Sequence, residues 1–183
     1  MDDLRKPDVV TIAVSRVDGG LTILKIVENE YVPNPENPTE RILNRHNDIT
    51  PEYIERIINK HGWTGDLAPT SWRQVSNDFI NEETDQSFRN AWKDELKDSP
   101  AVDMVKARVI HKEKMREART PLLEELDIAY QRADEIADIS AKTEIAQKKQ
   151  ALRDVTIDPG IEAATTPEEL KACWPECLTS VEV

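Results

Sequence analysis

One apolar seam through residues 103–136 limits the folds open to this chain more than any other feature. Its members recur three or four residues apart: Met104, Ala107, His111, Met115, Ala118, Leu122, Leu126, Ala129, Ala133 and Ile136. That spacing predicts one long amphipathic helix, with Asp103 as its N-cap. Pro121 interrupts the seam, and an interior proline costs a helix about 3 kcal/mol. We therefore expect either one kinked helix or two helices that meet near Thr120.

A weaker seam after Asp138 indicates a second helix that folds back on the first. Its members are Ala141, Ile145, Lys148, Leu152 and Val155. The later half of the first predicted helix is acidic, through Glu124, Glu125, Asp127, Asp134, Glu135 and Asp138. The second is basic, through Lys142, Lys148, Lys149 and Arg153. This complementarity predicts an antiparallel helical hairpin with acidic and basic flanks facing each other.

The early half of the long helix is basic, which opposes the helix dipole. Its basic members are Lys106, Arg108, Lys112, Lys114, Arg116 and Arg119. An antiparallel second copy would match this basic half to an acidic half, and a solvated face without a partner is the alternative. Glu113 and Glu117 interrupt the basic stretch and it lacks aromatic residues, so it does not favour nucleic-acid binding.

The N-terminal region shows the strongest strand signals. Residues 9–15 and 21–27 are rich in β-branched residues, and Asp18-Gly19-Gly20 lies between them, so they predict a β-hairpin. Residues 31–39 carry three prolines and no periodicity, which predicts a loop. A helix is then predicted from Thr50-Pro51 to His61-Gly62.

Residues 63–100 are mixed, and a short strand is plausible at 71–75. Their aromatic residues are spaced too irregularly for one helix: Trp63, Trp72, Phe79, Phe88 and Trp92. We expect them to close a small core over the hairpin, with a ligand-stacking platform as the alternative. A last helix start is predicted at Thr166-Pro167.

The predicted fold class is therefore α+β, with a small N-terminal domain that contains a β-hairpin, followed by a long antiparallel helical hairpin. The expected divisions are a mixed domain over 1–100, a helical arm over 101–157, and a short helix with a tail over 158–183.

Charge argues against two classes of partner. There are 36 acidic and 24 basic residues, for a net charge of −12. This balance disfavours binding to nucleic acid and to anionic membranes, and it favours a basic partner. No stretch approaches the roughly 18 apolar residues of a transmembrane helix, and residues 1–7 lack the apolar run of a signal peptide. We expect a protein kept in a reducing cytoplasm unless it leaves within a particle.

No motif points to catalysis, a metal or a cofactor. The five glycines form no phosphate-binding loop, and no nucleophile motif is present. His46, His61 and His111 form no metal motif, and His111 is expected to pack in the helical seam. Cys173 and Cys177 lie too far from any histidine for a structural zinc site, so we interpret them as thiols, with a local disulfide as the alternative.

An ordered set of segments in the second half resembles a known family. The segments are Asp85–Trp92, Val102–Arg108, Arg116–Leu123, Leu126-Asp127, Lys149–Val155 and Leu170–Pro175. Together they are similar to proteins encoded among the tail genes of tailed phages and prophages, and to the C-terminal part of bacteriophage tail fibre assembly proteins. The resemblance spans roughly residues 85–175 and brings no catalytic residue with it.

The resemblance implies a non-enzymatic tail protein that binds tail fibre or other tail components, located in the virion or, during assembly, in the host cytoplasm. A structural or accessory subunit is expected, with a transient assembly chaperone as the first alternative. An intracellular coiled-coil adaptor and an enzyme with an unrecognised site are the others. The candidate partner-binding residues are Arg108, Lys112, Arg116, Arg119, Glu124, Glu125, Trp63, Trp72 and Trp92. An oligomer is expected, and no cofactor.

Overall fold

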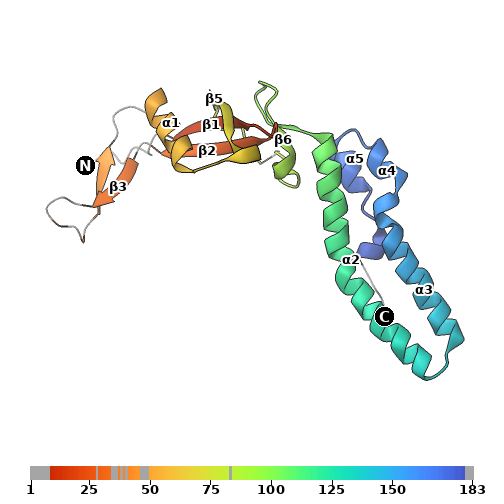
Figure 1. The fold of residues 1–183 in the computed structure, drawn as a ribbon. Helices are drawn as coiled ribbons and strands as arrows, with labels where there is room; N and C mark the ends of the chain where they lie inside the picture. The colour runs from red at the N-terminus through yellow and green to blue at the C-terminus, as the bar shows by residue number, and fades with distance from the viewer. Residues whose placement is uncertain are drawn as a thin grey trace. The chain divides into compact units, whose positions relative to one another are not determined.

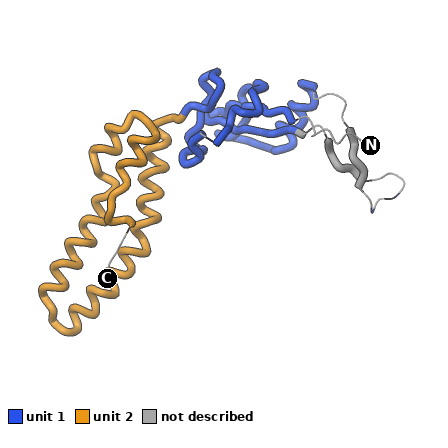
Figure 2. The backbone as a smooth tube through the Cα atoms, turned by 180° about the vertical axis from the view of Figure 1, so that it is seen from behind, with its two compact units in different colours: residues 1–101 blue, residues 102–183 orange. Residues whose placement is uncertain are grey.

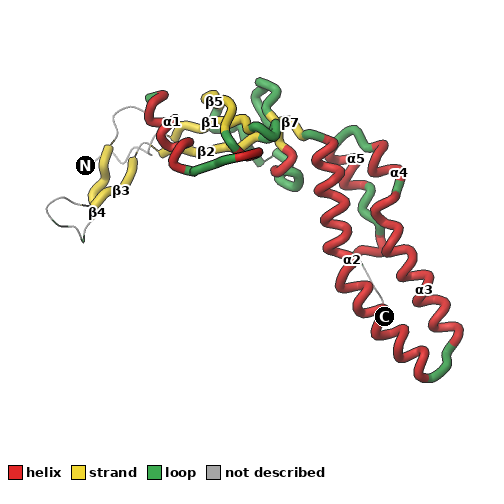
Figure 3. The backbone as a smooth tube through the Cα atoms, viewed as in Figure 1, coloured by secondary structure: helices red, strands yellow, loops and turns green. Residues whose placement is uncertain are grey.

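The computed structural model confirms the α+β class, with a small antiparallel sheet followed by long helices (Figures 1 and 3). It describes residues 9–27, 29–33, 37, 39, 41–45, 50–82 and 84–179. The chain divides into two compact units, Met1–Ala101 and Val102–Val183, which we call unit 1 and unit 2 (Figure 2). The segment 158–179 belongs to the same unit as the predicted helical arm.

The predicted hairpin is confirmed. Strand β1 (Val9–Arg16) pairs antiparallel with β2 (Leu21–Val27). The Gly19 N–H donates to the Arg16 carbonyl at 2.9 Å, and the Arg16 N–H donates to the Gly20 carbonyl at 3.0 Å. Gly19 has φ +72°, a left-handed conformation that glycine adopts without a Cβ clash. The Asp18 side chain accepts from the Gly20 N–H at 2.8 Å and fixes the turn.

Strand β5 (Pro69–Val75) extends this sheet in the order β2-β1-β5. Helix α1 (Pro51–Lys60) covers one face of the sheet, and its N-cap is Thr50, as predicted. The buried core between them consists of Ile12, Val14, Ile26, Ile54 and Ile58. Alternate residues of β1 therefore supply one side of this core, as the two-residue period of a strand requires.

Segment 76–100 covers the opposite face of the sheet. The Thr11 hydroxyl donates to Asn77 Oδ1 at 2.8 Å, and the Arg73 guanidinium lies over the Phe79 ring. Phe79 and Phe88 are buried here. This segment also contains the 3-10 turn Arg89–Ala91 and strand β6 (Trp92–Lys93), which pairs with β7 (Ala101–Val102) just after the segment. A further 3-10 turn, Gly65–Leu67, precedes β5.

The loop predicted over 31–39 is wrong for its first three residues. Strand β3 (Asn29–Pro33) pairs antiparallel with β4 (Arg41–Arg45), with Pro33 opposite Arg41. Proline is tolerated there because it ends the strand and removes no interior ladder bond. The other two prolines of the stretch lie outside the described residues, as do residues 1–8, His46 and residues 180–183.

Unit 2 is built on α2 (Met104–Glu135), one uninterrupted helix that contains Pro121. Asp103 is its N-cap, as predicted, and accepts from the Val105 and Lys106 N–H groups. The Thr120 hydroxyl donates to the Arg116 carbonyl one turn before, at 2.9 Å. Of the two alternatives at Pro121, the structure has the single helix.

The connection between the two long helices is a tight reversal. The Asp138 N–H donates to the Ala133 carbonyl at 2.9 Å, and the Ala137 N–H donates to the Asp134 carbonyl at 3.0 Å. This pair of bonds is a Schellman motif, which requires a left-handed residue, and Ala137 adopts φ +55°. Asp138 then caps α3 (Ile139–Asp154). We call the α2–α3 hairpin the arm.

Short elements after α3 pack back against the base of the arm: α4 (Pro159–Ala163), α5 (Pro167–Ala172) and the 3-10 turns Val155–Ile157 and Glu176–Leu178. Thr166 caps α5, as predicted. The base core consists of Ala107, His111, Met115, Leu152, Val155, Ile161, Ala164, Leu170 and Leu178. Figure 1 shows α4 and α5 in blue beside the start of α2.

Candidate functional site

Two predicted partner-binding arginines on α2 close the ends of other helices. Arg108 donates from Nε to the Ile161 carbonyl at 3.2 Å and from Nη2 to the Ala164 carbonyl at 2.9 Å. The last carbonyls of a helix have no intrahelical donor, so Arg108 completes the C-terminus of α4. Arg119 does the same for α3, because its Nη1 donates to the Leu152 and Arg153 carbonyls at 3.4 and 3.0 Å.

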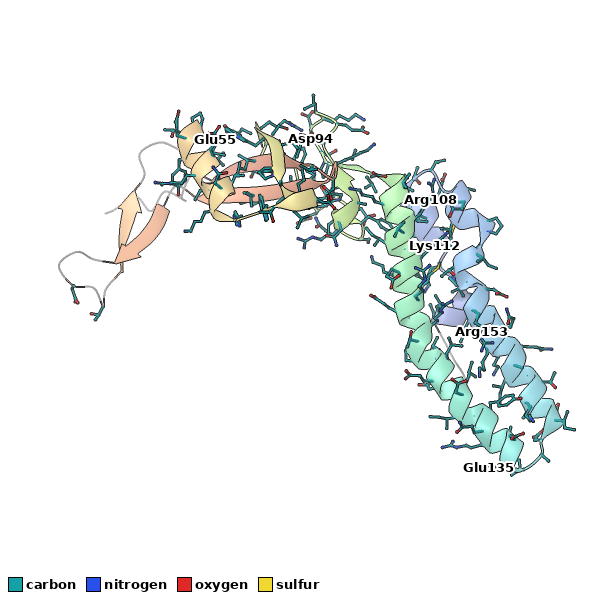
Figure 4. All side chains as sticks on the ribbon, viewed as in Figure 1. Glu55, Asp94, Arg108, Lys112, Glu135 and Arg153 are labelled. Carbon is teal, nitrogen blue, oxygen red and sulfur yellow. The ribbon has the colours of Figure 1, made fainter. Side chains whose placement is uncertain are left out.

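Lys112 is also engaged within unit 2. Its Nζ lies 2.6 Å from Glu162 Oε1 on α4, and this hydrogen bond lowers the pKa of Glu162. Figure 4 labels Arg108 and Lys112 on α2. Arg108, Lys112 and Arg119 are half-buried, and each is already engaged in contacts within unit 2. Sequence spacing does not reveal that the segment after α3 returns to the basic half of α2.

The internal contacts also answer what compensates the basic N-terminal half of α2. Arg108 and Arg119 meet carbonyls at two helix C-termini, where the dipole favours cations. No second copy of α2 is needed for that compensation. Arg116 differs from its neighbours, because it is exposed and pairs with Glu113 one turn earlier at 2.8 Å.

The acidic half of α2 confirms the predicted charge pairing across the arm. Asp127 pairs with Lys149, and Asp134 pairs with Lys142. Both lysine Nζ atoms also lie over the Tyr130 ring, at 5.3 Å for Lys142 and 5.5 Å for Lys149. The Asp134 hydrogen bond raises the pKa of Lys142. The predicted partner residues Glu124 and Glu125 remain exposed on α2.

The three candidate tryptophans all take part in the packing of unit 1. Trp92 is buried, and its Nε1 donates to the Asp85 carbonyl at 3.2 Å, so it is wrong as an exposed contact residue. Trp63 and Trp72 are half-buried against the core under α1, and Trp63 stacks on His61 with ring centroids 4.7 Å apart. These contacts confirm the expected small core.

Exposed apolar side chains gather on unit 2. Of the nine large apolar residues that are exposed in the described ranges, six belong to it: Val105, Val109, Ile128, Ile136, Ile139 and Ile157. Ile136 and Ile139 flank the reversal of the arm and are 76% and 77% exposed. We call these two residues the tip. The sequence placed Ile136 in the buried seam, which is wrong because α2 ends at Glu135.

A second feature that sequence reasoning missed lies in unit 1. An open cavity of about 280 Å³ separates α1 from β5. Glu55, Ile58 and Asn59 line it from the helix, and residues 69–72 line it from the strand. Its residues belong to two nearby elements of the chain, and only the folded arrangement shows that α1 and β5 leave a space between them.

The histidine and thiol candidates have structural surroundings. His111 is buried in the base core, its ring meets Trp174 edge-on at 5.6 Å, and burial lowers its pKa. Cys173 and Cys177 are free thiols. The Cys173 Sγ donates to the Glu169 carbonyl at 3.3 Å, and burial raises the pKa of this thiol.

Among the described residues, no group of three or more His, Cys, Asp or Glu side chains has the arrangement of a metal site. In that same part of the chain, no helix combines the length and apolarity needed to cross a membrane. The chain matches no protein-family model, no curated protein and no solved structure.

Proposed function

We propose that this chain is a non-enzymatic bacteriophage tail protein whose arm binds tail fibre or another tail component. It acts as a structural or accessory subunit of the virion, and it reaches the particle from the host cytoplasm during assembly. The observation that carries the proposal is the tip, where two isoleucines are 76% and 77% exposed at the end of a helical hairpin.

The tip supports a binding role because the reversal forms without the two isoleucine side chains, so folding does not explain why they are apolar. Asp138 and the Ala133 and Asp134 carbonyls form the reversal without help from either isoleucine side chain. Contiguous exposed apolar patches commonly mark contact sites, and the two isoleucines lie three residues apart, one at each side of the reversal. Two ion pairs join α2 and α3 within the arm, so a partner can bind the tip while the two helices stay paired.

A double variant tests the tip directly. We expect Ile136→Asn with Ile139→Asn to lower incorporation into particles at least tenfold while the helical circular dichroism stays unchanged, because both side chains are already in water. Ile157→Asn is the matched control, since this isoleucine is 73% exposed but lies after α3 rather than at the reversal. Equal incorporation of the double variant and wild type would contradict the role of the tip.

Mass spectrometry of purified particles tests the tail setting. Stoichiometric peptides from this chain are expected in particles from the source phage or induced prophage. Presence in the lysate but absence from particles would instead favour the assembly chaperone. A source that forms no particles would remove the phage proposal and favour the coiled-coil adaptor, which sedimentation would detect as a dimer.

The charged candidates need a narrower test than their sequence positions suggest. Reversing Arg119 would disturb the end of α3, so a loss of binding there would be ambiguous. Arg116 is exposed, and its guanidinium pairs with Glu113, an i,i+3 pair on the surface of α2. Arg116→Glu should therefore weaken partner binding with a loss of stability below about 1 kcal/mol if the flank of α2 contributes to the interface.

A further inference from the structure

One edge of the unit 1 sheet is open. Strand β5 pairs with β1 on one side, and no strand of the described ranges pairs with its other side. Natural edge strands are commonly protected by charged side chains, prolines or bulges. Here Pro69 and a bulge at Ser15/Arg16 protect one end, and the rest of β5 has no proline or bulge and one charged side chain, Arg73.

The ladder shows which backbone groups of β5 face outward. The Arg16 N–H donates to the Gly20 carbonyl, so the backbone groups of Arg16 point toward β2. Direction alternates along a strand, so the odd-numbered residues 11–15 of β1 point toward β5. The register pairs them with Ser71, Arg73 and Val75. The N–H and C=O groups of Trp72 and Gln74 are therefore the ones that face the open edge.

The cavity between α1 and β5 lies on one face of this edge. Trp72 pairs with Val14 and Gln74 pairs with Ile12, and both partners belong to the core beneath α1. A strand added to β5 would turn alternate side chains to the same face, toward the cavity. The cavity is open and has a volume of about 280 Å³, so a side chain of the added strand can enter it.

The charges beside the edge select the kind of peptide. Glu55 lines the cavity from the exposed side of α1, and the whole chain carries a net charge of −12. Arg73 is the one charged residue of β5, and it is held on the other face by Asp94 at 2.8 Å and the Lys97 carbonyl at 2.9 Å. Nothing on β5 therefore repels a basic segment from the cavity face.

We infer that β5 and α1 form a docking groove for an extended segment of a partner protein, which adds a strand to the sheet. The segment carries an apolar side chain for the cavity and a lysine or arginine two residues away for Glu55, because residues two apart share a face. This groove belongs to unit 1, and its occupation is independent of the proposed role of the arm.

The test uses the full chain, labelled with ¹⁵N, and an array of seven-residue peptides with blocked ends. The peptides alternate threonine with an apolar residue, and a lysine or a glutamate replaces one apolar residue. We expect the lysine peptides to bind and to slow amide exchange at Trp72 and Gln74 at least tenfold. Glu55→Lys should weaken lysine peptides up to about fivefold and strengthen the glutamate peptides, as expected for a surface ion pair.

A separate test distinguishes backbone pairing from non-specific binding through side chains. Peptides methylated at alternate amide nitrogens keep their side chains but lose the donors of one edge, so they should not bind. In the protein, Gln74→Pro removes one outward N–H and should abolish binding, since proline is tolerated where a strand N–H faces solvent. Gln74→Thr keeps the N–H and is the control. The methylated peptides give the same answer if Gln74→Pro does not fold.

Three results would overturn the inference. One is equal binding of methylated and unmethylated peptides, and another is an array without any lysine peptide that protects Trp72 and Gln74. The third is a concentration-dependent dimer that protects those two amides and excludes the peptides, because a second copy would then be the occupant.

Discussion

Arg119 gives the sharpest test of how unit 2 is held together. Replacing it by methionine keeps the apolar stem and removes the guanidinium that meets the end of α3. A hydrogen bond from a charged donor contributes roughly 1.5–3 kcal/mol. Only the 3.0 Å bond to Arg153 is short, and the site is half-buried, so we count one such bond at the low end. We expect Arg119→Met to lower the free energy of unfolding by about 1–2 kcal/mol.

Arg116→Met is the matched control, because it changes the same residue type one turn away on the same helix. Its contact is an exposed i,i+3 pair with Glu113, for which about 0.3–0.5 kcal/mol is expected. Urea unfolding followed by circular dichroism at 222 nm reports on unit 2, which contains most of the helix. The two variants should differ by about 1 kcal/mol in the free energy of unfolding.

Equal losses for the two variants would refute the role of Arg119 as a helix-end donor. Equal losses would also indicate that the Arg119 side chain lies in solvent, as the Arg116 side chain does. A loss confined to Arg119→Met would instead explain why this residue should not be mutated to test partner binding.

Three further outcomes follow from local geometry. Ala137→Gly should raise the melting temperature of unit 2 by roughly 2–6 °C in calorimetry, because it relieves a left-handed alanine at the reversal; an unchanged temperature would contradict the Schellman geometry. Gly19→Ala should destabilise unit 1 by about 1 kcal/mol in urea unfolding, since φ is +72° there; a neutral effect would argue against that turn. Burial lowers the pKa of His111 in the folded state below the value near 6.5 of the unfolded state, so the unfolded state takes up the proton at a higher pH. Stability should therefore be full above pH 7 and fall as the pH drops below about 6.5. His111→Phe should flatten this slope in urea midpoints taken between pH 7.5 and 5.5, and an unaltered slope would exclude His111 as its source.

Local signals made the element starts predictable. Thr50, Asp103, Asp138 and Thr166 each cap a helix through their own side chain, and that chemistry involves neighbours within three residues. The pairing of the arm was predictable as well, because the charge pattern of two adjacent helices is complementary. The hairpin turn at Gly19 belongs to the same class of local signal.

Contacts between residues that lie far apart in the sequence were not predicted. Nothing near Arg108 in the sequence indicates that the carbonyls of Ile161 and Ala164 will lie beside it. The groove next to β5 likewise requires α1 to cross the sheet first. The left-handed residue at the reversal is Ala137 rather than a glycine, so the sequence contains no turn signal there. Ile136 was for that reason assigned to the seam.

The two ion pairs of the arm have a consequence for its reach. Asp127 and Asp134 are seven residues apart on α2, and Lys142 and Lys149 are seven apart on α3. Inserting one heptad into each helix between these positions would leave both pairs opposite each other and would lengthen the arm by about 10 Å. The base and the tip would keep their own contacts. The length of the arm can therefore change in steps of one heptad per helix, while the contacts at the base and at the tip stay the same.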